Sequence, residues 1–265
     1  MASALHAVDV DTTAHMVIQT PKGVVQRTIT ALIEFIRELG YKRCIIRSDN
    51  EPAITAMTAE VGKQREEETV IEEIQVANSR AVGVVERGNR TVGSLARAYR
   101  SAFDKNYGFQ LMPAMAVTSW LLRHVAWVLN RYCVGRDGLT PYERYKGRPY
   151  MGEVCELFEK VHWIVPSAKE HKFENRTEVG LWLGKTSKGD SHLVFNDEVH
   201  QVRTVQRLPE ERRWDKRLVE ALDAFPWLPR PPRVRERTRN VTWAYVRRYG
   251  GDSWLQGVQR GRNLP

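Results

Sequence analysis

The stretch Cys44-Ile45-Ile46-Arg47-Ser48-Asp49-Asn50-Glu51-Pro52 places an aspartate at the end of an apolar run. The run predicts a strand, and the proline that closes the stretch predicts the first turn of a helix. After 36 intervening residues, Gly83-Val84-Val85-Glu86-Arg87 places a glutamate at the head of a basic helical segment. A strand end and a helix start can therefore present two carboxylates to one ligand.

Two carboxylates from separate elements can hold a divalent cation against a phosphodiester, because hard cations take oxygen ligands and phosphate oxygens complete the shell. The spacing alone is weak evidence, since the chain has 32 acidic residues. The segments around the pair must decide whether Asp49 and Glu86 form a metal site.

The first half of the chain alternates between strand-like and helix-like segments. Polar residues 11–13 separate two short β-branched segments, which predicts a hairpin. Apolar residues then recur at helical spacing as far as Leu39, and Gly40 closes that helix. The expected elements are strands at 5–10 and 14–19, a helix at 24–39, a strand at 41–47, a helix at 52–61, an exposed loop at 63–68 and a strand at 70–76. This alternation predicts an α/β fold.

The helix expected over 84–103 has two different faces. One face carries Glu86, Arg90, Arg97 and Arg100, and the opposite face carries Val92, Leu95, Ala96, Tyr99 and Phe103. An ordinary amphipathic helix with a solvated basic face would show the same pattern. A second, strongly apolar helix is expected over 111–133, as a core helix or a subunit interface.

The pattern changes after Pro149 to short strands, expected at 160–165, 178–183, 192–196 and 201–205. Strands at this spacing predict a small β-sheet or barrel. Beyond it the chain is rich in proline and arginine, and residues 225–265 are expected to be largely extended or disordered. The expected domains are 1–148, 149–208 and a basic tail over 209–265.

The net charge of +9 is unevenly distributed. Residues 86–148 hold eleven basic and four acidic side chains, and residues 225–265 hold nine arginines and two acids. Both regions would suit phosphate contacts, although a solvated basic tail would look similar. The sequence has no signal-peptide pattern and no apolar stretch as long as a membrane span. We therefore expect a nuclear or cytoplasmic protein that is not secreted.

The order of the motifs resembles that of a known family. The strand with Ser-Asp-Asn-Glu-Pro, the acidic stretch and Gly-Val-Val-Glu-Arg is similar to the catalytic core of retrotransposon and retroviral integrases. Leu129-Asn130-Arg131, Thr140-Pro141-Tyr142-Glu143-Arg144 and Trp182-Leu183-Gly184 look like segments of copia-type retrotransposon integrases. The resemblance implies a ribonuclease-H-like core, a small C-terminal β domain that is SH3-like or barrel-like, and a basic tail.

The resemblance also implies a chemistry. Integrases transfer DNA strands with paired Mg²⁺ or Mn²⁺ ions, which three carboxylates hold, and Asp49 and Glu86 match the second and third. Arg90 matches a DNA-contacting position one turn beyond the glutamate. Candidate phosphate contacts are Arg97, Arg100, Arg233, Arg235 and Arg237. The implied partners are DNA and further copies of the chain, with no membrane.

The first carboxylate should lie on an opening strand that is central in the sheet. Asp9 and Asp11 are the only aspartates before Asp49, and they resemble a non-catalytic turn after the family's second strand. The opening strand is therefore expected to be absent, which would leave backbone groups of its neighbours unpaired. Val82 also departs from the asparagine that is common before the family's Gly-x-x-Glu segment. These departures indicate a truncated or degenerate polyprotein fragment.

Three functions follow from these patterns. The first is integrase-type strand transfer, impaired in this chain. The second is a catalytically inactive DNA-binding or interaction module derived from an integrase. The third is a ribonuclease-H-like nuclease.

Overall fold

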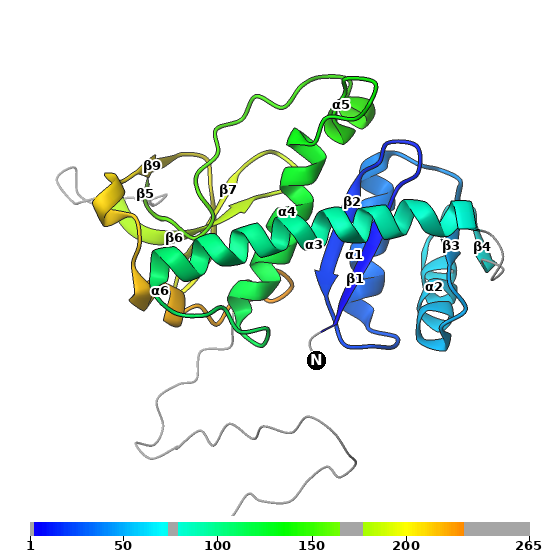
Figure 1. Ribbon diagram of the computed structural model, residues 1–265, viewed down its shortest axis with the longest axis horizontal. Coiled ribbons are helices and arrows are strands. Elements are labelled where there is room, and N and C mark those ends of the chain that lie inside the picture. The colour runs from blue at the N-terminus through cyan, green and yellow to red at the C-terminus, as the bar shows by residue number, and fades with distance from the viewer. Residues whose placement is uncertain (1–2, 74–78, 165–176, 231–265) are drawn as a thin grey trace, which may run out of the picture. The chain divides into compact units, whose positions relative to one another are not determined.

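The structure, a computed structural model, describes residues 3–73, 79–164 and 177–230 (Figure 1). Residues Ala2–Pro231 form one compact unit. Its elements, in chain order, are β1 (Ala4–Val8), β2 (His15–Gln19), α1 (Gln26–Leu39), β3 (Cys44–Ser48), α2 (Pro52–Gln64), β4 (Thr69–Glu73), α3 (Ser79–Tyr107), α4 (Ala116–Tyr132), α5 (Pro141–Lys146), β5 (Lys160–Ile164), β6 (Thr177–Lys185), β7 (His192–Asn196), β8 (Glu198–Val202), β9 (Val205–Arg207), η1 (Glu210–Arg212) and α6 (Lys216–Glu220). The predicted α/β class is confirmed.

The turn signals in the sequence act as expected in the first half of the chain. β1 and β2 form the predicted antiparallel hairpin. α1 ends at Gly40, whose φ of 85° is in the left-handed region that glycine adopts readily. Pro52 occupies the first turn of α2, where no intrahelical donor is lost.

The exposed loop expected at 63–68 is wrong in part. α2 continues to Gln64, and the side chain of Arg65 is only 1% exposed. Its guanidinium donates hydrogen bonds to the backbone oxygens of Tyr41 and Glu68 and to the hydroxyl of Thr69. These bonds tie the entrances of β3 and β4 together. A charged residue is buried here because backbone carbonyls satisfy its donors.

The N-terminal strands form two separate two-stranded sheets. β1 pairs with β2 in antiparallel fashion, and β3 pairs with β4 in parallel. Within the described residues, neither β1 nor β3 has a strand along its other edge.

Both small sheets cover the same pair of helices. Helices α1 and α2 supply a cluster of buried side chains, namely Ile29, Leu32, Ile36, Met57 and Val61. Partly buried residues pack against this cluster from β1 (Leu5 and Ala7), β2 (Met16) and β3 (Cys44 and Ile46). The helix pair therefore holds the two sheets in one layer.

The helix expected over 84–103 is longer at both ends and extends from the N-terminal strands to the C-terminal sheet (Figure 1). It lies close to β1 at Gly88, where an added Cβ would meet His6 Cε1 at 2.8 Å and Val8 Cγ2 at 2.9 Å. Only a residue without a side chain fits this approach.

Two histidines complete the contact between α3 and the hairpin. Asn89 Oδ1 lies 2.6 Å from His6 Nδ1, and His6 Nε2 lies 3.0 Å from His15 Nδ1. The amide oxygen of Asn89 can only accept, so the His6 Nδ1–H donates to it and His6 Nε2 accepts from His15. Burial and the neighbouring His6 lower the pKa of His15 to about 4. The pair therefore holds its hydrogen bonds in the neutral form.

The C-terminal strands form one antiparallel sheet in the order β8-β7-β6-β5-β9. The single strand expected at 201–205 is wrong, because β8 and β9 are separate strands at opposite edges of this sheet. One hydrophobic cluster joins the sheet to α3 and α4, with Trp120, Trp182 and Phe158 among its largest buried side chains. An SH3-like topology and the domain boundaries stay predictions.

Part of the predicted tail is folded in the described residues. Residues 210–220 include η1 and α6, and the side chains of Leu222 and Ala224 are buried in the main cluster. The turn Phe225–Leu228 closes with two backbone hydrogen bonds, and the carbonyl of Pro229 accepts one from Val199. The remaining tail, 231–265, lies outside the described residues. None of the described helices is long and apolar enough to cross a membrane.

We predict that Gly88→Ala lowers the free energy of unfolding by about 1–3 kcal/mol, because the new methyl group overpacks the contact between α3 and β1. Gly83→Ala on the same helix is the matched control. Its Cβ would meet only Arg87 Nη1, at 3.7 Å, so it should be neutral or stabilise the helix by up to about 1 kcal/mol. Urea denaturation measures both. Equal effects at the two positions would contradict the close approach.

Acid should weaken the fold through His15. The unfolded chain binds a proton near pH 6.5 and the folded chain only near pH 4, so the unfolded state binds more protons between these values. The free energy of unfolding should therefore fall as the pH drops from about 6.5 to about 4, and His15 should account for on the order of 2 kcal/mol of this fall. Above this pH range His15 should not change the free energy of unfolding. Burial also lowers the pKa of His192, to about 4, with the same sign. His15→Gln should flatten the dependence measured by urea denaturation; a curve parallel to that of the unmodified chain would refute the assignment.

Candidate nucleic-acid and metal site

Asp49 is the first residue after β3, and its side chain is exposed. The nearby Glu51 is engaged by Lys22, whose Nζ lies 2.7 Å from Glu51 Oε1. This hydrogen bond is the main reason that the pKa of Lys22 is raised. Asp49 itself makes no hydrogen bond or salt bridge with the described residues, so its oxygens are available to a ligand.

Glu86 lies on α3, two residues before Gly88, where the helix contacts β1, and its side chain is exposed. It too has no hydrogen bond or salt bridge with the residues whose side chains the structure describes, 3–72, 83–164 and 177–230. The fold therefore leaves both predicted carboxylates uncommitted. Whether they converge on one ion stays a prediction.

Asp9 closes the turn after β1. Its Oδ2 accepts hydrogen bonds from the backbone N–H of Thr12 at 2.8 Å, from the Thr12 hydroxyl at 2.5 Å and from the Tyr41 hydroxyl at 3.1 Å. Asp11 receives a longer bond of 3.4 Å from the same tyrosine. Burial and the charge of Asp9 raise the pKa of Tyr41. These contacts agree with the expectation that both aspartates belong to a turn.

Among the described residues, no three side chains of His, Cys, Asp or Glu lie close enough together to hold a metal ion. Asp49 and Glu86 supply two carboxylates of the three that paired cations would require. The residues present therefore do not complete the implied two-metal site.

The basic face of α3 is exposed at Arg90, Arg97 and Arg100. Arg97 Nη2 donates to Ser94 Oγ at 3.0 Å, which leaves its charge unpaired, whereas Arg100 lies 3.9 Å from a carboxylate oxygen of Asp104. Arg90 has no salt bridge among the described residues. This row of cations on one rigid element can follow a phosphate backbone. The predicted contacts Arg233, Arg235 and Arg237 lie outside the described residues.

The copia-like segments stabilise the fold around this site. The side-chain amide of Asn130 accepts from His15 N at 2.7 Å and donates to His15 O at 2.8 Å, which joins α4 to β2. Thr140 and Glu143 form a reciprocal capping box at the start of α5. Arg144 pairs with Asp137 and donates to the Thr12 carbonyl, so α5 is tied to the hairpin turn.

Arg131 of the same segment stacks over aromatic rings. Its guanidinium carbon lies 4.3 Å from the ring centre of Trp127, 5.0 Å from that of Tyr142 and 5.2 Å from that of Tyr150. These cation–π contacts join α4 to α5 and the following segment. The motif residues are therefore structural, and Arg131 is not an exposed phosphate contact.

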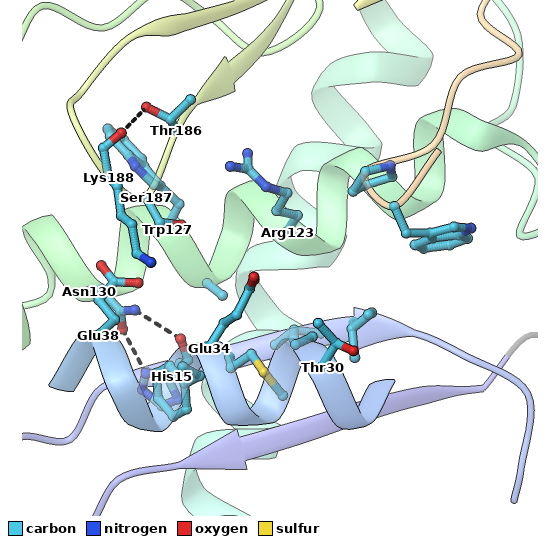
Figure 2. Close-up of a pocket in the computed structure, with 18 of the residues that line it drawn as sticks. His15, Thr30, Glu34, Glu38, Arg123, Trp127, Asn130, Thr186, Ser187 and Lys188 are labelled. Atoms are coloured by element: carbon cyan, nitrogen blue, oxygen red, sulfur yellow. Dashed lines mark hydrogen bonds between the residues drawn. The ribbon is translucent and has the colours of Figure 1, made fainter. Parts of the chain in front are cut away.

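A cleft of about 930 Å³ lies between α1, β2, α4 and the turn 186–188, and sequence reasoning missed it (Figure 2). Glu34 and Glu38 of α1 line one side, and Arg123 and Lys188 line the other. Burial raises the pKa of Glu38, and burial together with Arg131 lowers that of Arg123 to about 10. Segments far apart in the sequence line this cleft, including Tyr145, Gln201 and Trp227, so no local pattern predicts it. Neither Asp49 nor Glu86 lines it.

Several solved integrase structures are similar to this chain, and the similarity is low. No protein-family model matches, and neither does any curated protein. The catalytic core domain of BIV integrase is 21% identical, with 54% of this chain and 85% of that chain covered at a TM-score of 0.41. The HTLV-2 integrase catalytic core domain in complex with magnesium, in a trimeric form, is 20% identical, with 54% and 93% covered at a TM-score of 0.39.

A simian T-cell lymphotropic virus intasome in complex with PP2A regulatory subunit B56 gamma is also similar. It is 15% identical, with 78% of this chain and 77% of that chain covered at a TM-score of 0.42. Scores this low do not establish a shared fold. The proposed function therefore rests on the residues and elements of the chain itself.

Proposed function

We propose that this chain is an integrase-derived protein that binds DNA through the basic face of α3 and the arginine-rich tail, and whose strand-transfer activity is impaired. The observation that carries the proposal is the pairing of an exposed arginine row with an uncommitted Glu86 on one helix. An ordinary amphipathic helix can carry the same exposed residues, and the salt dependence of DNA binding separates the two roles.

Three further features support an integrase origin. Asp49 ends a strand and is exposed, Glu86 follows on the next long helix, and the copia-like segments occur in the expected order. The family resemblance assigns the first carboxylate to a strand between β1 and β3. Among the described residues, Asp49 and Glu86 supply two of the three carboxylates that the resemblance implies.

The proposal also covers the partner, the cation, the oligomeric state and the location of the protein. DNA is the proposed nucleic-acid partner, and Mg²⁺ or Mn²⁺ is the cation that Asp49 and Glu86 would contact. The protein is proposed to form a homo-oligomer and to be nuclear or cytoplasmic. The carboxylates of the described residues do not complete a site for two metal ions.

Asp49→Asn and Glu86→Gln should each weaken Mn²⁺ binding several-fold, because each removes a charged oxygen ligand from an already sparse site. Glu51→Gln is the matched control, since Glu51 is held by Lys22. Titration of free Mn²⁺ by electron paramagnetic resonance measures the three affinities. Equal losses in all three variants would indicate general attraction of cations instead of a site.

The unmodified chain should show little Mg²⁺-dependent joining of DNA 3′ ends. Two carboxylates cannot position two ions. A gel-based strand-transfer assay on the full chain tests this expectation. Robust joining would show that Asp9 or Asp11 supplies the first carboxylate, and the proposal of impaired activity would be withdrawn.

DNA affinity should depend steeply on salt, because each neutralised phosphate releases counterions. Arg90→Ala should flatten the log–log salt slope by about one unit, and deletion of 231–265, which removes eight arginines and two acids, should flatten it by several units. Arg43→Ala is the control, since Arg43 is held by Glu68 at 2.7 Å. Fluorescence anisotropy at several salt concentrations measures the slopes. Unchanged slopes in both test variants would mean that these arginines are only solvated.

A further inference from the structure

The cleft between α1 and α4 follows one side of α1. Arg27, Thr30, Glu34 and Glu38 line it, and they are three or four residues apart, so their side chains share one face of the helix. This stripe extends over about three turns, roughly 16 Å. The volume of about 930 Å³ is in the range of small-molecule sites. The cleft therefore has the size and the length for an extended small molecule.

The two acids of this stripe have no partner in the described structure. Glu34 and Glu38 make no hydrogen bond or salt bridge with residues 3–72, 83–164 and 177–230, whose side chains the structure describes. Glu34 is exposed and extends from α1 into the cleft (Figure 2). Glu38 is half-buried, and burial raises its pKa. Because a half-buried carboxylate without a partner is costly, this wall favours a cationic ligand group.

The opposite wall carries a free cation. Lys188 is exposed and extends from the turn 186–188 toward α1 (Figure 2). Its ammonium group has no hydrogen bond or salt bridge with the same described side chains. Burial dominates the pKa of Glu38, and the charges of Arg131, Lys146 and Lys188 oppose the rise. The two walls are therefore close enough to interact electrostatically, but their charges are not paired with each other.

The lining between the charges suits an aliphatic chain better than a nucleobase. The rings of Trp127 and Trp227 line the cleft, and each already has two neighbours stacked on it. These neighbours are Arg131 and His124 for Trp127, and Arg27 and Phe225 for Trp227. Neither ring is thus a free stacking platform for a base. Ala31, Phe35 and Ala126 supply the apolar lining along the helices.

We propose that this cleft binds a small zwitterion of the basic amino-acid class, in which a short aliphatic chain joins a guanidinium group to a carboxylate. The guanidinium contacts Glu34 and Glu38, and the carboxylate contacts Lys188. A guanidinium suits the acidic wall because its planar array of five donors can bridge two carboxylates one turn apart. The inference goes beyond DNA binding and does not depend on it.

The test uses the full chain and three soluble probes in isothermal titration calorimetry. L-Arginine carries both charged groups, L-citrulline replaces the guanidinium by a neutral group of nearly the same shape, and agmatine lacks the carboxylate. L-Arginine should bind about tenfold or more tightly than either analogue, because each analogue loses a charge-assisted contact. Equal affinities for L-arginine and L-citrulline, or no binding of L-arginine, would overturn the proposal.

Variants locate the binding in the cleft. The double variant Glu34→Gln and Glu38→Gln should abolish the preference for L-arginine over L-citrulline. Lys188→Gln should abolish the preference for L-arginine over agmatine. Glu60→Gln is the matched control, since Glu60 lies on α2 and is held by Lys63 at 2.6 Å, and it should keep both preferences. Circular dichroism checks that all variants are folded. Preferences that survive in the cleft variants would place the binding elsewhere.

A second copy of the chain is the competing occupant. Sedimentation velocity measures the oligomeric state with and without L-arginine. If the double variant dissociates an oligomer and L-arginine does not bind the unmodified chain, the cleft is a subunit contact and the ligand assignment is wrong. If L-arginine binds with the expected preferences and the oligomeric state of the double variant is unchanged, the result supports a ligand site.

Discussion

The close approach of α3 to β1 at Gly88 is the constraint on which the candidate site depends. A side chain at this position would collide with His6 and Val8, so the helix can lie against the hairpin only at a glycine. The hydrogen bonds from Asn89 through His6 to His15 then fix the rotation of α3. With one face held in this way, Glu86 and the arginines are directed to solvent. The exposure of the proposed DNA-binding face follows from a packing contact on the opposite side of the helix.

The same hairpin is held from a second direction by α4. Asn130 bonds to both backbone groups of His15, and Arg144 of α5 reaches the hairpin turn. A single short strand pair thus receives contacts from α3, α4 and α5. This concentration of contacts explains how the hairpin keeps its position although one edge of β1 has no strand beside it. The integrase-like segments here contribute to stability, and this role is independent of any catalytic activity.

The division of the N-terminal strands into two sheets has an energetic consequence. A five-residue parallel pair and a five-residue hairpin would be marginal alone, and the apolar surface of α1 and α2 supports both. Arg65 adds a buried polar tie between the entrances of β3 and β4. In addition to their own backbone pairing, the two small sheets are therefore supported by the apolar side chains of α1 and α2, and β3 and β4 also by Arg65.

The sequence by itself determined the elements whose signals are local. Periodicity and turn residues predicted the hairpin, α1 with its end at Gly40, α2 with its start at Pro52, and α3 with its two faces, because these depend on neighbours within a few residues. The same local signals misjudged Arg65 and the division between β8 and β9, since carbonyls and strand partners distant in sequence decide those features. Tertiary structure alone decided the roles of Asn130 and Arg131 and the cleft between α1 and α4. Each of these needs groups from segments far apart in the chain to meet, and no local pattern contains that information.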